Sequence, residues 1–262
     1  MQNKNPPLVS VIMNCHNGEK FLKDSLKSLL KQSYKNWELI FFDNNSSDNS
    51  KKIIKLYKDK RIKFFFSKKK VNLYNARNLA IKKSTGKYIS FLDVDDLWDK
   101  NKLKLQLNYL KKNKEFKIIY SNYTVLDESQ NRRYKKYYKN LNSGYITQSL
   151  LKNYSIGILT VLFEKKIIGK KYFNNVYNII GDFDYFLRLS LKNKIAYMPL
   201  CLATYRIHDR NYSTLNLKEY INELKDWIKK NNNVYKKYTF YHIHYYLMKL
   251  RIKLFLKSFL GV

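Results

Sequence analysis

Short apolar runs alternate with helical repeats along the first half of the chain. The runs are rich in β-branched and aromatic residues, which predicts buried strands at 8–14, 37–43, 63–67, 88–93 and 116–127. Between them apolar residues recur every three or four positions, which predicts helices from 19, through 53–57, and over 75–84 and 101–113. This alternation is typical of a mainly parallel sheet with helices on both faces.

The second half of the chain is less regular. Residues 131–144 are basic and aromatic with little periodicity, which predicts a mobile loop. Helical and strand patterns return from about 145 to 205, and the chain is helical from Leu217 onward. We therefore expect an α/β fold with a Rossmann-like, mostly parallel central sheet flanked by helices. The expected domain covers 1–215, followed by a basic, aromatic helical tail over 216–262.

The charge of the chain is strongly positive. It has 262 residues with 52 Lys and Arg against 20 Asp and Glu, a formal net charge of +32. Such a field attracts phosphates, so a basic nucleic-acid-binding protein without catalysis is one alternative. Lys, Asn, Ile, Tyr and Phe are all abundant, a bias that AT-rich codons also produce. We see no recognised nucleic-acid-binding motif, and charge alone decides little.

The cysteines and the termini indicate the compartment. Cys15 and Cys201 are the two cysteines of the chain, too few for a secreted disulfide framework, although two could form one bond. The first residues lack the basic start and apolar core of a signal peptide, and no stretch of 18 residues is apolar without charge. We expect a cytoplasmic protein.

The scarce acids gather after an apolar strand. The stretch YISFLDVDDLWDK places Asp93, Asp95 and Asp96 at the end of the run over 88–93. Asp43 follows another predicted strand. Because parallel strands share one carboxyl edge, where open α/β sheets bind their ligands, we expect these acids to converge on one cleft.

These acids allow two interpretations. Two carboxylates flanking Val94 suit Mg²⁺ or Mn²⁺ shared with a diphosphate, because both ions prefer oxygen ligands. Alternatively, an acid here caps the helix that follows, as acids do well. Asp43 is likewise either a turn residue or a hydrogen-bond acceptor for a base or ribose.

Several motifs together resemble the family 2 glycosyltransferases with the GT-A fold. They are VSVIMNCHNGEKFLKDSLKSLLKQSYKNWELIFFDNNSSDNS, then NARNLAI, then GKYISFLDVDD. The similarity is close over 7–127 and looser to about 213. It implies a nucleotide-sugar-binding half at 7–127 and an acceptor-side half at 128–215.

The resemblance also implies roles for single residues on the donor side. The loop after the first strand would touch the base, Asp43 the uracil or ribose, and the NARN pair the diphosphate and sugar. In the DxD motif the first acid would contact ribose or sugar and the second the metal. The implied nucleotide-sugar contacts are Asn14, His16, Asn17, Asp43, Arg77, Asn78, Asp93 and Arg206, and the implied metal ligands are Asp95 and His208.

The catalytic base is implied by the segment IGDFDYFLRLS. Its best match is Asp182, which alternatively only caps the helix. Gly181 stands where the family commonly has an acid, so Asp184 is the second choice. The segment YRIHDRNYS resembles a late YRxH motif, in which Arg206 would contact phosphates and His208 the metal or diphosphate. A single His is otherwise more often a surface or hydrogen-bonded residue.

The resemblance implies an inverting glycosyltransferase. It would move a hexosyl or N-acetylhexosaminyl group, from a UDP-linked donor, to a glycan or lipid-linked acceptor in surface polysaccharide synthesis. A divalent metal, Mn²⁺ or Mg²⁺, would serve as cofactor, and no specific nucleic acid is expected as a partner. In the tail, Lys249, Lys253 and Lys257 form a cationic stripe. Residues 240–262 are thus either an interfacial helix on the anionic inner face of the cytoplasmic membrane, or a helix packed on the protein or a partner.

Overall fold

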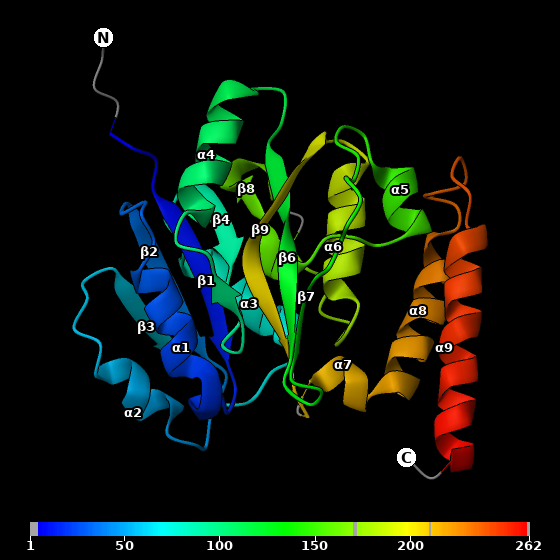
Figure 1. The fold of residues 1–262 in the computed structure, drawn as a ribbon, viewed down its shortest axis with the longest axis horizontal. Helices are drawn as coiled ribbons and strands as arrows, with labels where there is room; N and C mark the ends of the chain where they lie inside the picture. The colour runs from blue at the N-terminus through cyan, green and yellow to red at the C-terminus, as the bar shows by residue number, and fades with distance from the viewer. Residues whose placement is uncertain (1–4, 170–171, 210, 261–262) are drawn as a thin grey trace.

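One nine-stranded sheet runs through a computed structural model that describes residues 5–169, 172–209 and 211–260 (Figure 1). Its order is β3-β2-β1-β4-β8-β6-β9-β5, and β7 pairs with β6. The strands are β1 (Val9–Cys15), β2 (Trp37–Asp43), β3 (Ile62–Phe66), β4 (Tyr88–Phe91), β5 (Leu97–Trp98), β6 (Ile118–Asp127), β7 (Arg132–Lys135), β8 (Leu162–Glu164) and β9 (Ile195–Ile207).

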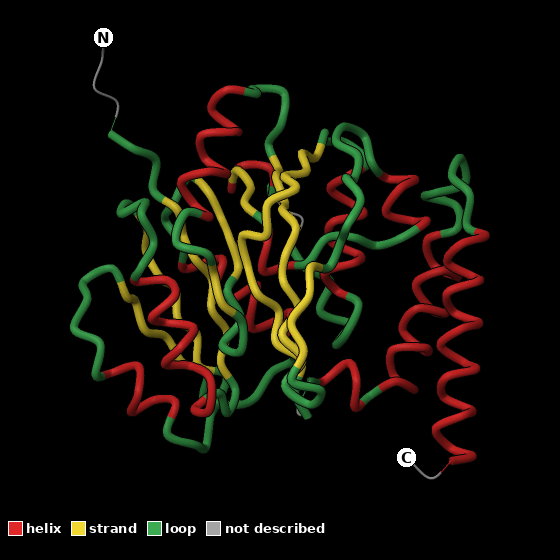
Figure 2. The backbone as a smooth tube through the Cα atoms, viewed as in Figure 1, coloured by secondary structure: helices red, strands yellow, loops and turns green. Residues whose placement is uncertain are grey.

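The helices lie on both faces of this sheet and at one side (Figure 2). They are α1 (Glu19–Leu30), α2 (Ser50–Lys55), α3 (Leu73–Lys83), α4 (Lys102–Lys112), α5 (Thr147–Lys152), α6 (Gly181–Ser190), α7 (Tyr212–Leu215), α8 (Leu217–Asn231) and α9 (Tyr241–Leu260), with short 3-10 turns at Ile158–Thr160 and Lys165–Ile167. The expected α/β fold with a C-terminal helical tail is confirmed.

The sheet is mixed, and its longer ladders are parallel. β1 runs parallel to β2 and to β4, β2 parallel to β3, and β6 parallel to β9. The short strand β8 is antiparallel to both β4 and β6 and joins the two parallel parts. The carboxyl ends of β1, β2 and β4 therefore meet at one edge, as the sequence predicts.

Two hydrophobic clusters cover the two faces because side chains alternate along each strand. In β1, Val9 and Val11 pack with α1, α2 and α4, whereas Ile12 packs with α3, α5, α6, α8 and α9. The tail helix α8 thus shares its core with the sheet, since Leu224 and Trp227 are buried in the second of these clusters. The boundary between 215 and 216 stays a prediction.

The expected mobile loop at 131–144 is wrong in part. Its residues Arg132–Lys135 form β7, which pairs antiparallel with Thr124–Asp127 of β6. The turn before it is held by the carboxylate of Asp127, which accepts hydrogen bonds from the backbone of Ser129 and Gln130. The sequence pattern did not reveal this edge strand, because its basic side chains are mostly exposed. They lack the alternation of apolar and polar residues that burial of one face produces.

No helix in the described ranges is long and apolar enough to cross a membrane. Cys15 is buried and Cys201 is half-buried, and both are free thiols.

Candidate active site

A cavity of about 700 Å³ opens at the edge where β1, β2 and β4 end. The first half of the chain supplies the strand-end residues and α3, and the second half supplies the start of α6 and the residues around α7. The cavity lining includes seven side chains that the sequence singles out: Asn14, His16, Arg77, Asp93, Asp95, Asp96 and Asp182.

Asp93 forms an ion pair with the buried Arg77. The Nη2 atom of Arg77 lies 2.9 and 2.7 Å from the two carboxylate oxygens. Arg77 comes from α3, whose first turn is capped by Asn72, so the helix start and the guanidinium both face the cavity. A buried arginine beside a helix N-terminus suits an anion such as a diphosphate.

Asp95 is held by the end of β9. The Nε2 atom of His208 lies 3.0 Å from its Oδ2 atom, and the guanidinium of Arg206 donates to its backbone oxygen. Asp96 is turned inward and accepts a hydrogen bond from the backbone of Arg206. Burial, and then the charges of Asp95 and Asp93, raise the pKa of Asp96 well above its usual value.

The described residues include no group of three or more His, Cys, Asp or Glu side chains that could hold a metal ion. Asp95 nevertheless lines the cavity and pairs with the buried imidazole of His208, which is not part of the lining, as an oxygen and nitrogen pair. A pair of this kind fits Mg²⁺ or Mn²⁺ when substrate phosphates and water complete the shell.

The residues after β1 and β2 divide into two groups. Asn14 is buried in the cavity wall, and neither polar atom of its amide has a hydrogen-bond partner. His16 is exposed there and contacts the backbone oxygen of Asn44. By contrast, Asn17 bonds Ser47 outside the lining, and Asp43 is fully buried beneath it, 3.4 Å from Lys51.

Asp182 lies in the first turn of α6 and reaches the cavity from the opposite half of the chain. Its Oδ1 atom lies 3.3 Å from the hydroxyl of Tyr74. Burial raises the pKa of Asp182, although the charge of Arg77 works against that shift. Gly181 is required before it, because an added Cβ would lie 2.5 Å from the ring of Tyr74.

Asp184, the second choice for the base, points away from this cavity. Its carboxylate pairs with Arg188 at 2.8 Å and accepts a hydrogen bond from the indole of Trp227 at 3.0 Å. Asp182 and Asp184 are two positions apart on α6, and each residue rotates the side chain by about 100°. Their side chains therefore point in nearly opposite directions.

Besides His208, two further sequence-predicted residues lie outside the cavity lining, for identifiable reasons. The amide of Asn78 is used twice by the backbone of Phe173, so it anchors the segment before α6. The guanidinium of Arg206 pairs with Glu128 at 2.6 Å and stacks over Phe21. Neither side chain reaches the cavity as the resemblance led us to expect.

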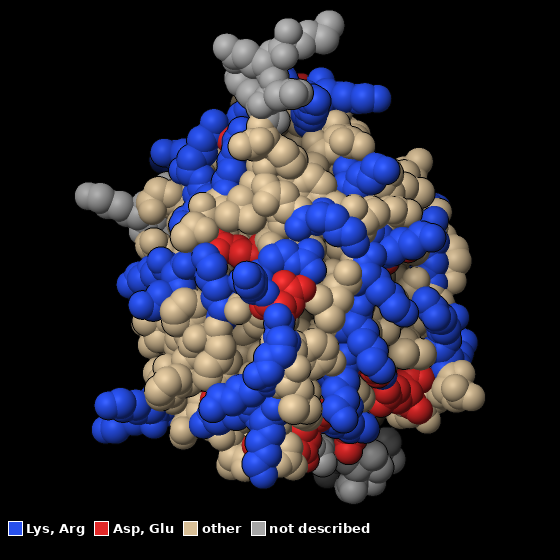
Figure 3. Space-filling view, turned by 90° about the vertical axis from the view of Figure 1, so that its left-hand side faces the viewer, with Lys and Arg blue, Asp and Glu red and all other residues tan. Residues whose placement is uncertain are grey.

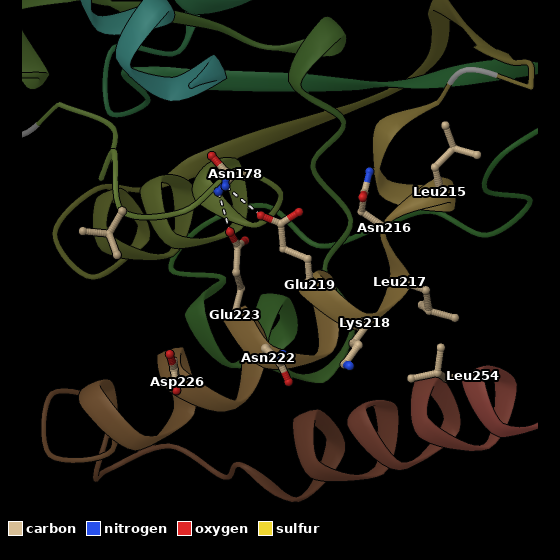
Figure 4. A pocket seen from close by; sticks show the side chains of 11 residues that line it. Asn178, Leu215, Asn216, Leu217, Lys218, Glu219, Asn222, Glu223, Asp226 and Leu254 are labelled. Atoms are coloured by element: carbon tan, nitrogen blue, oxygen red, sulfur yellow. Dashed lines mark hydrogen bonds between the residues drawn. The ribbon is translucent and has the colours of Figure 1, made fainter. Parts of the chain in front are cut away.

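Glu223 is a residue that the sequence did not single out. From α8, its carboxylate accepts hydrogen bonds from the backbone N–H groups of three successive residues, 178 to 180, just before α6. Figure 4 shows the contact of Glu223 with the first of them, Asn178. Three donors on one carboxylate hold the segment that leads into Asp182. No local pattern signals this contact, because it joins elements more than forty residues apart.

Other missed residues line the cavity itself. Tyr74 shares a helix face with Arg77, and Lys70 adds a second cation at the wall. Elsewhere the basic side chains are dispersed. Figure 3 shows Lys and Arg spread across the face beside β3 and α2, with small acidic groups between them.

Comparison with known proteins places this site in context. The family described as Glycosyl transferase family 2 matches residues 10–177. The chain is 35% identical over 217 residues to the Escherichia coli UDP-Glc:alpha-D-GlcNAc-diphosphoundecaprenol beta-1,3-glucosyltransferase WfgD, covering 81% of this chain and 82% of that protein. It is 31% identical over 211 residues to the Bacillus subtilis putative teichuronic acid biosynthesis glycosyltransferase TuaG, covering 79% and 82%.

Two solved structures share the fold. S. aureus TarS 1–349 in complex with UDP-GlcNAc aligns with a TM-score of 0.71 and 17% identity, over 86% of this chain and 66% of that chain. The mannosyltransferase PcManGT of Pyrobaculum calidifontis, in complex with GDP-Man and Mn²⁺, aligns with a TM-score of 0.66 and 14% identity, over 92% and 70%.

Proposed function

The chain belongs to glycosyl transferase family 2, and from this premise we propose that it is an inverting enzyme that moves a sugar from a UDP-sugar to a glycan or lipid-linked acceptor. One observation carries the proposal. Asp93 and Asp95 enter a single cavity from the strand ends, and Asp182 enters it from α6. Asp93 and Asp95 would thus serve metal and donor binding, and a separate carboxylate, that of Asp182, would remove the proton.

The donor would bind along the strand ends. The buried amide of Asn14 is left without a partner, which favours a polar ligand group, because a buried amide without hydrogen bonds is costly. Arg77 and Lys70 supply positive charge for the diphosphate, and Asp93 an acceptor for ribose or sugar hydroxyls. His16 would lie beside the base, and Asp43 holds the neighbouring loop after β2 by accepting a hydrogen bond from the backbone of Ser46.

Asp95 and His208 would hold Mn²⁺ or Mg²⁺ together with the donor phosphates. When bound, the ion neutralises charge that develops on the leaving diphosphate. The buried Arg77 would contribute to the same neutralisation from a fixed position, so less reorganisation is needed during the reaction, and the exposed Lys70 would add charge.

Asp182 would act as the general base. It takes the proton of the acceptor hydroxyl as that oxygen attacks the anomeric carbon, and the bond from this carbon to the diphosphate breaks. Attack opposite the leaving group inverts the configuration. Asp182 supports this role better than Asp184, whose carboxylate is occupied by Arg188 and Trp227.

The names of the relatives support a lipid-linked acceptor and a UDP donor. WfgD is named for UDP-Glc and a diphosphoundecaprenol acceptor, and TuaG for teichuronic acid biosynthesis. We infer a hexosyl or N-acetylhexosaminyl transfer on the cytoplasmic side, with the enzyme peripheral on the inner face of the cytoplasmic membrane. On the face beside β3 and α2, acidic groups lie between the basic side chains, which does not favour a nucleic-acid-binding surface there.

A donor screen tests the proposal. UDP-, GDP- and dTDP-sugars are offered with Mn²⁺, and thermal stabilisation and donor hydrolysis are measured for the wild type and Asp95→Asn. We expect UDP-sugars to stabilise the wild type and hydrolysis to fall on the order of a hundredfold in the variant. Asp59→Asn is the matched control, because Asp59 pairs with Arg61 outside the cavity lining. Equal hydrolysis by wild type and Asp95→Asn would contradict the proposal.

A further inference from the structure

Helix α9 carries two apolar stripes on opposite sides. The inner stripe packs against the core and has a spacing of three and four residues. Its members are Ile243, Leu247, Leu250 and Leu254, of which the first three are buried. This stripe packs α9 against α5 and α8, and the ring of Tyr246 adds a contact with Tyr220 of α8.

The second stripe, here called the outer stripe, faces solvent. It repeats at the same helical spacing but is rotated by about half a turn, at 100° per residue. Its members and their exposed fractions are Tyr241 (67%), Tyr245 (43%), Met248 (49%), Ile252 (51%) and Phe255 (66%). A contiguous row of large apolar side chains is unusual on a solvent-exposed helix and marks an interaction site.

Cations border the outer stripe on both sides. Lys249 and Lys253 lie along one flank and Arg251 along the other, and all three are exposed. From Lys229 to the end the sequence contains eight Lys or Arg and no acid. The side chain of Lys257, expected in the same row, lies outside the described residues. Long cationic side chains can bury their stems while their charged ends stay in water.

A groove lies on the inner side of α9, opposite the outer stripe. Beside the C-terminal half of α9, this groove of about 710 Å³ is lined by Leu254 together with the exposed side chains of Val176 and Leu215 (Figure 4). The groove and the catalytic cavity share Asn178 as a wall residue.

We propose that the outer stripe docks on an anionic lipid bilayer, with its aromatic and aliphatic side chains in the headgroup region and the flanking cations on lipid phosphates. This deepens the proposed function. It rests on that function only for its purpose, which is to hold the enzyme at the surface that carries a lipid-linked acceptor. A helix with apolar residues, aromatics and flanking lysines on one face is suited to such an interface.

Two other partners for the outer stripe are a second copy of the chain and a nucleic acid, and both fit it less well. Two copies of α9 paired through the outer stripe would bring Lys249, Arg251 and Lys253 against the same cations of the partner, with no acid on the helix to offset them. The phosphates of a nucleic acid would pair with the cations. The five large apolar side chains of the outer stripe would then face its polar sugar-phosphate backbone, which offers them no apolar contact. An anionic bilayer satisfies both.

Vesicle binding tests the proposal with the full chain. Sedimentation with vesicles of 30% phosphatidylglycerol in phosphatidylcholine is compared with pure phosphatidylcholine. We expect the wild type to bind the anionic vesicles, and the pair Ile252→Asn with Phe255→Asn to lose at least tenfold in affinity. The pair Lys249→Gln with Lys253→Gln should lose on the order of tenfold on anionic vesicles alone.

The matched control replaces two exposed apolar residues far from α9, Leu56→Asn with Phe66→Asn, and should bind as the wild type does. Thermal unfolding checks that each variant folds. No binding by the wild type, unchanged binding by the α9 variants, or a dimer that the Ile252 and Phe255 changes dissolve would each overturn the proposal. Hydrolysis of UDP-sugars without vesicles is measured in parallel, because its absence would refute the enzyme assignment but not the docking surface.

Discussion

The two edges of the central sheet hold carboxylates in opposite states. At the amino edge, Glu38 of β2 accepts hydrogen bonds from Ser10 and from the backbone of Thr85 and Gly86, and pairs with Lys63 at 2.5 Å. Burial alone would raise the pKa of Glu38, but these partners outweigh it and lower the pKa to about 2.

At the carboxyl edge Asp93 and Asp95 have ion-pair partners, but two other polar groups are less well matched. Asn14 has no partner for its amide, and burial raises the pKa of Asp182 despite its hydrogen bond with Tyr74. A carboxylate whose partners outweigh its burial stabilises the fold, whereas one whose burial outweighs its partners costs stability and is available to a ligand. The difference between the edges therefore separates the residues that hold the sheet from those that we propose act on substrate.

The largest expected effect comes from the base. Asp182→Asn should lower kcat by about 10²–10⁴-fold, because general base catalysis typically contributes this much. Because the pKa of Asp182 is raised, wild-type activity should rise with pH through a value above that of an ordinary Asp. Initial rates over pH 4 to 8 measure both effects.

Asp184→Asn is the matched control on the same helix. It should lower thermal stability by breaking the pair with Arg188, and it should keep the acidic limb of the pH profile. If Asp184→Asn abolishes that limb and Asp182→Asn keeps it, the assignment of the base is reversed.

An intermediate effect is expected from Glu223, which positions the start of α6. Glu223→Gln would present N–H groups to backbone donors and displace the segment before Asp182. We expect kcat to fall on the order of tenfold with KM for the donor unchanged, because small displacements of a catalytic group lower turnover.

The control Asp226→Asn removes the same charge from an exposed site of α8 and should leave kcat unchanged. A change in donor KM without a change in kcat would show that Glu223 acts on donor binding rather than on Asp182.

The smallest effect on turnover is expected at the amino edge. Glu38→Gln should leave kcat within about twofold but destabilise the fold, since a shift from 4.5 to about 2 corresponds to about 3 kcal/mol. A lowered pKa gives stability above the unfolded pKa, which is lost as pH falls. The difference in unfolding free energy between wild type and variant, measured in urea, should thus be largest at pH 7 and should decrease as the pH falls below 4.5.

The same two edges explain what sequence could predict. The strand-end part of the cavity could be predicted because parallel strands bring their carboxyl ends to one edge. Asn14, Asp93 and Asp95 therefore line one cavity, as the sequence predicted. The rest depends on contacts across the chain. Arg206 forms an ion pair with Glu128 instead of lining the cavity. Glu223 accepts hydrogen bonds from the segment before α6, although it lies on a helix that the sequence assigned to a separate tail.

The division of labour within the cavity is tested most directly by titrating UDP-sugar and Mn²⁺ into Asp182→Asn in a calorimeter and following single-turnover transfer in the same sample. We predict donor affinity within about threefold of the wild type and transfer reduced at least a hundredfold. Transfer at the wild-type rate, or donor affinity lost together with transfer, would contradict separate carboxylates for donor binding and proton removal.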